Sequence, residues 1–182
     1  MTSHTAVSNS NTHLIIVMGV SGSGKSTLAN RLGQIYGYHY IDGDDFHSEA
    51  SRSLMAQGIA LTDAEREPWV ATLKTYLQEC ALQHRHVILA FSGLKRKHRD
   101  ALRSAGLRTI FVYLNGSKVT IQERINHRKD HFMAPALLDS QFASMEDPLS
   151  EPDVHLIDVS VDFEQVVTNA QKIICDYLLT TL

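Results

Sequence analysis

The chain has 182 residues, 43% of them hydrophobic, which is enough for one compact domain with a sizeable core. Its formal net charge is -3, so no basic footprint indicates a nucleic-acid partner. No apolar run approaches the length of a membrane-spanning helix, so we expect no membrane partner. Residues 1–12 are polar and lack Lys and Arg, which predicts a disordered tail before a single domain over residues 13–182.

Apolar runs and helical patterns alternate along this domain. We expect strands at residues 13–18, 38–41, 87–91, 108–114 and 154–159. We expect helices at residues 26–36, 46–57, 68–83, 94–104, 117–128, 135–145 and 163–179. A capping-box pattern at residues 62–65 also favours a helix start before Pro68, where the long helix would restart. Strands separated by helices predict an α/β fold with a parallel sheet of about five strands.

The first strand leads into a glycine-rich loop with the pattern G-x-x-x-x-G-K-S/T, formed by Gly19, Gly24, Lys25 and Ser26. Such a loop turns backbone N–H groups around a phosphate, and the following helix points its positive end at the same anion. The pattern therefore predicts a P-loop NTPase fold that binds ATP and Mg²⁺. Lys25 would reach the β- and γ-phosphates, and Ser26 would hold the metal. The residues expected to bind the nucleotide are Gly19, Val20, Ser21, Gly22, Ser23, Gly24, Lys25, Ser26 and Thr27.

Three carboxylates follow the second strand, in the stretch from Asp42 to His47. Ligands of such sheets gather at the carboxyl ends of the strands, where these carboxylates would meet a cation or a hydroxyl. We expect Asp42 to face the metal and Asp44 to face the hydroxyl of an acceptor, both as catalytic residues. The alternative is a solvated turn in which Asp45 caps the next helix.

Two groups of basic residues follow later strands. Lys95 and Arg99 lie four residues apart after the third strand, where they would meet an anionic substrate or form an exposed helix face. Arg124, Arg128 and His131 form the second group, in a segment that would close over the transferred phosphoryl group. We expect Arg124 near the adenine or α-phosphate and Arg128 at the γ-phosphate. The alternative for this group is an ordinary surface helix.

Other features narrow the class of protein. No N-K-x-D guanine-reading sequence occurs, and no Asp ends the third strand at Phe91, so GTPase signatures are missing. Cys80 and Cys175 are interpreted as reduced, buried thiols, with a disulfide as the less favoured alternative. We interpret Trp69 as a core aromatic rather than a substrate-stacking residue. Small size, an early acidic turn and a late arginine segment favour a small-molecule kinase.

These residues resemble the thermoresistant, shikimate-kinase-like gluconokinase family. The resemblance covers about residues 14–178, and its specific patterns are D-G-D-x-x-H, T-D-x-x-R-x-P-W and H-F-M…L-L-x-S-Q-F in this order. These patterns stand at residues 42–47, 62–69 and 131–142.

The resemblance implies ATP-dependent phosphorylation of D-gluconate to 6-phospho-D-gluconate, with Mg²⁺, by a cytoplasmic homodimer. It also implies a mobile lid at about residues 124–135 and a substrate-binding region between His47 and Trp69. Gluconate is a polyol with one carboxylate, for which Arg66, Lys95 and Arg99 are the expected charge partners. The expected substrate-binding residues are Asp44, His47, Arg66, Lys95, Arg99 and His131.

The chain also departs from the family pattern. Ser48 stands where the family usually has Pro, and Ser51 and Leu54 stand where it usually has Asn and Lys. The last two changes fall in the expected substrate-binding region and would alter the choice of acceptor or weaken its binding. An adenylylsulfate kinase, a shikimate-type kinase and a nucleotide-binding regulator with weakened catalysis therefore remain alternatives.

Overall fold

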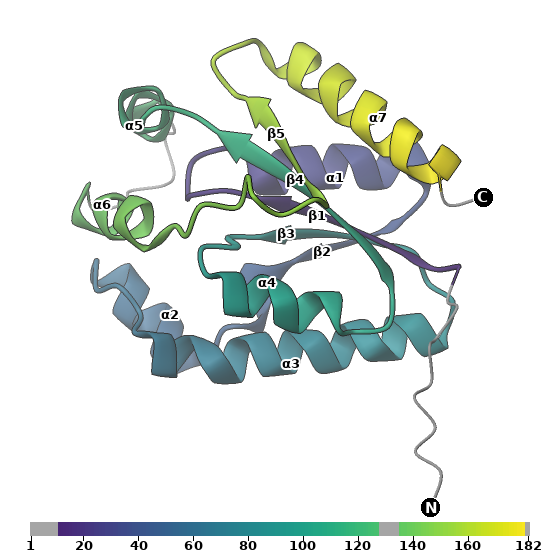
Figure 1. Cartoon of the computed structure of the whole chain (residues 1–182). Coiled ribbons are helices and arrows are strands. Elements are labelled where there is room, and N and C mark those ends of the chain that lie inside the picture. Colours follow the sequence, from purple (N-terminus) through teal and green to yellow (C-terminus); the bar gives the residue numbers. More distant parts are fainter. Residues whose placement is uncertain (1–10, 128–134, 181–182) are drawn as a thin grey trace, which may run out of the picture.

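The computed structural model describes residues 11–127 and 135–180. Five parallel strands form one sheet in the order β2-β3-β1-β4-β5 (Figure 1). This confirms the predicted parallel sheet of about five strands. The strands are β1 (His13–Met18), β2 (His39–Asp42), β3 (Val87–Phe91), β4 (Arg108–Asn115) and β5 (Val154–Asp158).

Helices connect these strands at nearly the predicted places. They are α1 (Lys25–Tyr36), α2 (Glu49–Ala56), α3 (Asp63–Leu82), α4 (Arg96–Arg103), α5 (Lys118–Asn126), α6 (Pro135–Ser144) and α7 (Phe163–Thr180), with a 3-10 helix η1 (Gly43–Phe46) after β2.

The helix predicted over residues 46–57 is divided in two. The η1 turn ends at Phe46, and α2 begins after Ser48, whose Oγ accepts a hydrogen bond from the backbone N–H of Ser51 at 3.1 Å. Asp42 caps η1 in the same way, through the N–H of Asp44. Asp45 therefore does not cap the next helix, because Ser48 fills that role.

The long helix α3 is continuous from Asp63 and does not restart at Pro68. Thr62 and Glu65 form the predicted capping box, each side chain bonded to the other residue's backbone N–H. This cap supplies hydrogen bonds to the first turn, which starts the helix ahead of the proline. Pro68 is exposed, and the helix passes it without ending.

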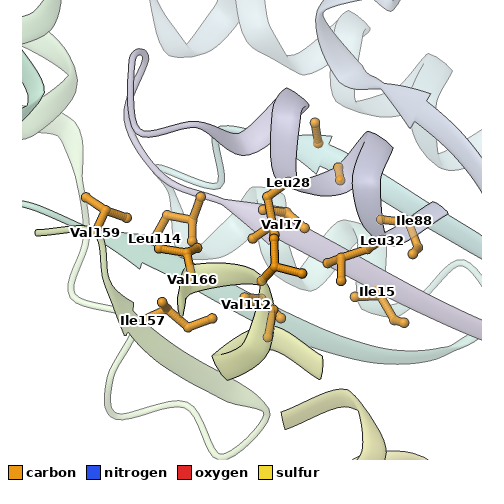
Figure 2. Close-up of a cluster of buried hydrophobic side chains, with 14 of the residues drawn as sticks. Ile15, Val17, Leu28, Leu32, Ile88, Val112, Leu114, Ile157, Val159 and Val166 are labelled. Atoms are coloured by element: carbon orange, nitrogen blue, oxygen red, sulfur yellow. The ribbon is translucent and has the colours of Figure 1, made fainter. Parts of the chain in front are cut away.

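The sheet is buried on both faces because side chains of a strand point alternately to opposite sides. On β1, Ile15 and Val17 pack with residues of α1 and α7, in the cluster that Figure 2 shows. Leu14, Ile16 and Met18 pack on the other face with residues of α3 and α4. All five side chains are fully buried, which explains the continuous apolar run in the sequence.

Three smaller expectations can now be compared with the structure. Thr12, assigned to the tail, is buried, and its carbonyl accepts a hydrogen bond from the N–H of Arg108, so the folded domain includes it. Cys80 is a buried free thiol as predicted, but Cys175 is exposed, because it lies on the outer side of α7. Within the described ranges, no helix is long and apolar enough to cross a membrane.

The carboxyl ends of the parallel strands lie at one edge of the sheet. The loop between β1 and α1 lies at this edge, and α2, α5 and α6 gather around it (Figure 1). Residues far apart in the sequence therefore meet there, as expected for the binding edge of an open α/β sheet.

Candidate active site

The phosphate-binding loop has the backbone of an anion cradle. Gly24 has φ +99° and precedes α1, and Gly22 has φ +80°, so both positions favour glycine. A Cβ at Gly22 would lie 2.5 Å from Cγ1 of Ile125, so α5 packs directly against the loop. Lys25 begins α1, and its Nζ donates a hydrogen bond to the carbonyl of Val20 at 3.1 Å. The lysine thus lies folded over the loop that it would share with a phosphate.

The two carboxylates of the acidic turn have different surroundings. Asp42 accepts hydrogen bonds from the N–H of Asp44 at 3.0 Å and from the hydroxyl of Tyr40 at 3.2 Å. The side chain of Asp44 is 72% exposed and is 3.8 Å from Nε2 of His47. Asp42 is therefore held within the turn, whereas Asp44 is open to a ligand.

Tyr40 joins the acidic turn to the phosphate-binding loop. Burial raises the pKa of its phenol to about 12, Asp42 adds to the rise, and a hydrogen bond to Ser26 opposes it. The sequence analysis gave this residue no role, because an aromatic residue on a strand predicts packing. Its hydroxyl connects the two side chains predicted to hold the metal.

Ser26 and Asp42 suit a magnesium ion that arrives with its nucleotide. A hydroxyl and a carboxylate oxygen are hard ligands of the kind Mg²⁺ prefers, and this ion is commonly held by few protein groups together with phosphates and water. In the part of the chain that the structure describes, no cluster of three or more His, Cys, Asp or Glu side chains is arranged to hold a metal ion. The donor set therefore fits a metal–nucleotide complex better than a metal bound by the protein alone.

A cavity of about 390 Å³ lies beside the loop and brings most of the predicted catalytic and acceptor residues together. It is lined by Ser21, Lys25, Asp44, His47, Met55, Ala56, Leu61, Arg66, Trp69, Ser92, Leu94, Leu137 and Gln141. Ser21 and Lys25 come from the phosphate-binding loop, and Asp44, His47 and Arg66 were predicted to bind the acceptor. One cavity thus contains groups suited to both partners of a phosphoryl transfer.

His47 and Trp69 form one wall of this cavity. Their rings stack at 4.1 Å, and the Nε1 of Trp69 donates a hydrogen bond to the carbonyl of Gly43 at 2.7 Å. Trp69 is only 5% exposed, so it is a core aromatic as predicted, although one edge of it lines the cavity. Burial holds the pKa of His47 below its ordinary value, which favours the neutral imidazole. Its Nδ1 is buried and has no hydrogen-bond partner among the described residues.

The three cations expected to bind a carboxylate are not equivalent. Arg66 lines the cavity, and its guanidinium is 3.3 Å from Asp63. Lys95 is 3.4 Å from Glu146 and does not line the cavity. Among the three, Arg66 therefore has the position that an acceptor carboxylate requires.

Arg99 is a buried structural residue, which corrects the expectation that it meets a substrate. Its side chain is completely buried, and its guanidinium donates to Glu151 and to the carbonyls of Gly93 and Glu146. Arg103 pairs with the same Glu151 carboxylate. Since its donors are used inside the protein, Arg99 has none to offer an acceptor.

The residues that depart from the family pattern line a neighbouring cavity. Ser51 and Leu54 border a second space of about 450 Å³, which shares Trp69 with the first. Neither residue lines the cavity that includes Lys25. Their effect on an acceptor would therefore be transmitted through α2 or Trp69 rather than by direct contact.

The later basic group is only partly described. Arg124 lies against the phosphate-binding loop, where it donates to the carbonyl of Ser23 at 3.4 Å and to that of Val159. Arg128 and His131 lie outside the described residues, as does most of the predicted lid. The other loop residues also differ: Ser23 is buried, whereas Ser26 and Thr27 are exposed at the start of α1.

Comparisons with known proteins agree with this arrangement. Residues 14–152 match the family profile described as an AAA domain. A mouse protein named probable gluconokinase is 42% identical over 166 residues, covering 82% of this chain and 89% of its own. The gluconokinase of Gluconobacter oxydans strain 621H is 38% identical over 148 residues, covering 81% of this chain and 83% of its own. The chain belongs to the gluconokinase family.

A solved structure supports the same membership. The crystal structure of a gluconokinase from Sinorhizobium meliloti 1021 superposes with a TM-score of 0.85 at 36% identity, covering 92% of this chain and 94% of that one. The gluconokinase fold therefore extends over nearly all of this chain. Two residues at its site, Tyr40 and Gln141, were given no role from the sequence. Gln141 lay within the S-Q-F pattern, which was the available signal.

Proposed function

We propose that the protein transfers the γ-phosphoryl group of ATP to D-gluconate and produces 6-phospho-D-gluconate and ADP. The observation that carries this proposal is the shared cavity. Ser21 and Lys25 of the phosphate-binding loop line the same space as Asp44, His47 and Arg66. A kinase needs its acceptor beside the terminal phosphate, and this cavity supplies that proximity.

The nucleotide would be held by the loop and the start of α1. Backbone N–H groups of residues 19–26 would surround the phosphates, and Lys25 would exchange its bond to Val20 for one to the phosphates. Ser26 and Asp42 would hold Mg²⁺, which supplies charge neutralisation on the phosphates when bound. Arg124, already against the loop, is suited to the nucleotide side of the site.

The acceptor would be held by groups of opposite character. Arg66 would bind the gluconate carboxylate, because charge-assisted hydrogen bonds to carboxylates are strong and directional. Asp44 would accept a hydrogen bond from the hydroxyl that attacks the γ-phosphorus. As the new P–O bond forms and the bond to ADP breaks, the hydroxyl proton would pass to the Asp44 carboxylate.

Several finer parts of the function remain predictions. The use of ATP with Mg²⁺, a homodimer and a cytoplasmic location are implied by the family resemblance. Arg128 and His131 would join the site from the segment expected to act as a lid. Sedimentation analysis of the purified protein would test the dimer, and nucleotide titration with and without Mg²⁺ would test the metal.

A coupled assay for ADP release tests the proposed activity against its alternatives. Gluconate, shikimate, adenylylsulfate and no acceptor would be compared at equal concentration with saturating ATP. The proposal expects ADP release that depends on gluconate, with little from the other acceptors. Nucleotide binding without turnover on any acceptor would instead favour a regulator with weakened catalysis.

A further inference from the structure

Gln141 connects α6 to the phosphate-binding loop. Its Oε1 accepts a hydrogen bond from the backbone N–H of Ser21 at 2.6 Å, although the two residues are 120 positions apart. Gln141 also lines the cavity that contains Asp44, His47 and Lys25. The side chain therefore lies between the phosphate end of the site and the space for an acceptor.

The bond to Ser21 fixes how the carboxamide is oriented. A backbone N–H can only donate, so the oxygen of Gln141 must face Ser21. The NH₂ group then carries two donor hydrogens, and no hydrogen bond from it is found among the described residues. A half-buried amide donor at a cavity wall is suited to an oxygen atom of a ligand.

The groups around Gln141 indicate which ligand this would be. Asp44 offers only acceptor oxygens, and Arg66 offers only donors. An acid with several hydroxyl groups needs both kinds of partner along its length. The NH₂ of Gln141 adds a neutral donor on the side of the cavity nearest the phosphate-binding loop.

We infer that Gln141 is an acceptor-binding residue, which holds a hydroxyl or carboxylate oxygen of the polyol acid through its NH₂ group. Its Oε1, anchored on Ser21, sets the distance between that oxygen and the phosphate-binding loop. This inference rests on the proposed function and assigns one further contact to its acceptor site. The competing explanation is a purely structural tie, in which the bond to Ser21 only stabilises the loop.

Two substitutions separate binding from structural support. Gln141→Met keeps the length of the side chain but removes both halves of the amide. Gln141→Glu keeps an oxygen for the Ser21 N–H but replaces the NH₂ donor with a second oxygen. Gln165→Met is the matched control, since Gln165 is an exposed glutamine of α7 whose amide bonds Asn169 at 3.0 Å.

The experiment measures kcat and KM for gluconate at saturating ATP, together with the ADP Kd and the Tm of each variant. We expect both Gln141 variants to raise the gluconate KM by roughly 5- to 10-fold or more, as loss of one hydrogen bond should. Gln141→Glu should raise it further, because a carboxylate repels the acid. The ADP Kd and Tm should remain close to those of Gln165→Met.

The competing outcomes are distinct. If Gln141→Glu behaves as wild type while Gln141→Met weakens ADP binding or lowers the Tm, the role is structural and the inference is overturned. An unchanged gluconate KM in both variants overturns it as well. If the wild type and Gln165→Met do not turn over gluconate at all, the proposed function itself fails, and the inference fails with it.

Discussion

Two regions of this protein contain arginines beside acidic residues, yet the two arrangements have opposite consequences. At the cavity, Arg66 is partly accessible and lies 3.3 Å from an exposed Asp63. Behind β3, Arg99 is completely buried and lies 2.5 Å from an equally buried Glu151. The first arginine keeps donors that a ligand can use, whereas those of the second are used within the protein. The comparison teaches that access and saturation of donors, rather than residue type, separate a binding arginine from a structural one.

The largest effect should come from breaking the buried pair. Arg99→Ala leaves Glu151 buried with only Arg103 as a cationic partner among the described residues, and should lower the free energy of unfolding by about 3–5 kcal/mol. Arg66→Ala, which breaks an exposed pair, should cost at most about 1 kcal/mol. Urea denaturation of both variants measures the difference.

A double variant sharpens this prediction. Arg99→Met combined with Glu151→Met removes both charges and should recover part of the lost stability, because neither charge is left unpaired. Equal, small losses in Arg99→Ala and Arg66→Ala would mean that the two regions do not differ as described.

The next effect concerns two lysines on either side of the same comparison. Lys25→Ala should leave the fold intact and reduce turnover by about 10²-fold or more, since it removes a preorganised charge from the transferred phosphate. Lys95→Ala should keep turnover of the same order, because Lys95 pairs with Glu146 outside the cavity. Steady-state assays with circular dichroism as a folding control would check both. Near-normal turnover in folded Lys25→Ala would contradict the nucleotide site.

The smallest effect should appear in the pH dependence of stability. Burial holds the pKa of His47 and of His98 below the unfolded value of 6.5. As the pH falls below 6.5, the unfolded chain binds these protons first, so stability is complete above that pH and declines below it. Hydrogen bonds from Arg99 and Arg103 hold the pKa of Glu151 below its ordinary value, despite the opposing effect of burial, so this pair keeps its charges over the same range.

The measurement is the Tm between pH 7.5 and pH 5.5. We expect a fall of a few degrees in the wild type, and a smaller fall in His98→Gln, which lacks one of the two buried imidazoles. A Tm that rises toward pH 5.5, or the same slope in the variant, would show that these histidines do not titrate as described.

Much of the fold followed from local sequence features. The apolar runs predicted all five strands to within one residue at each end, because β1 and β3 are buried on both faces. The phosphate-binding loop and the Thr62–Glu65 cap were also predicted, since each depends on residues a few positions apart. The division of the 46–57 helix was missed because Ser48 was considered only as a departure from the family pattern.

The site was predicted where its residues act alone and missed where they act in distant pairs. Asp44, His47 and Arg66 follow from a local pattern, and they line one cavity. The burial of Arg99 depends on Glu151, 52 residues later, and the position of Gln141 depends on Ser21, 120 residues earlier. No local pattern predicts such partners, so the sequence could name these residues but not their surroundings.

The central claim is that the cavity selects a carboxylate-bearing polyol through Arg66, and the ratio of kcat/KM for gluconate to that for glucose tests it most directly. This ratio would be measured in the wild type and in Arg66→Met. The account predicts that gluconate is strongly preferred by the wild type, and that Arg66→Met lowers the ratio by about 10- to 150-fold, as loss of a charge-assisted hydrogen bond should. Equal use of both sugars by the wild type, or an unchanged ratio in a folded Arg66→Met, would contradict it.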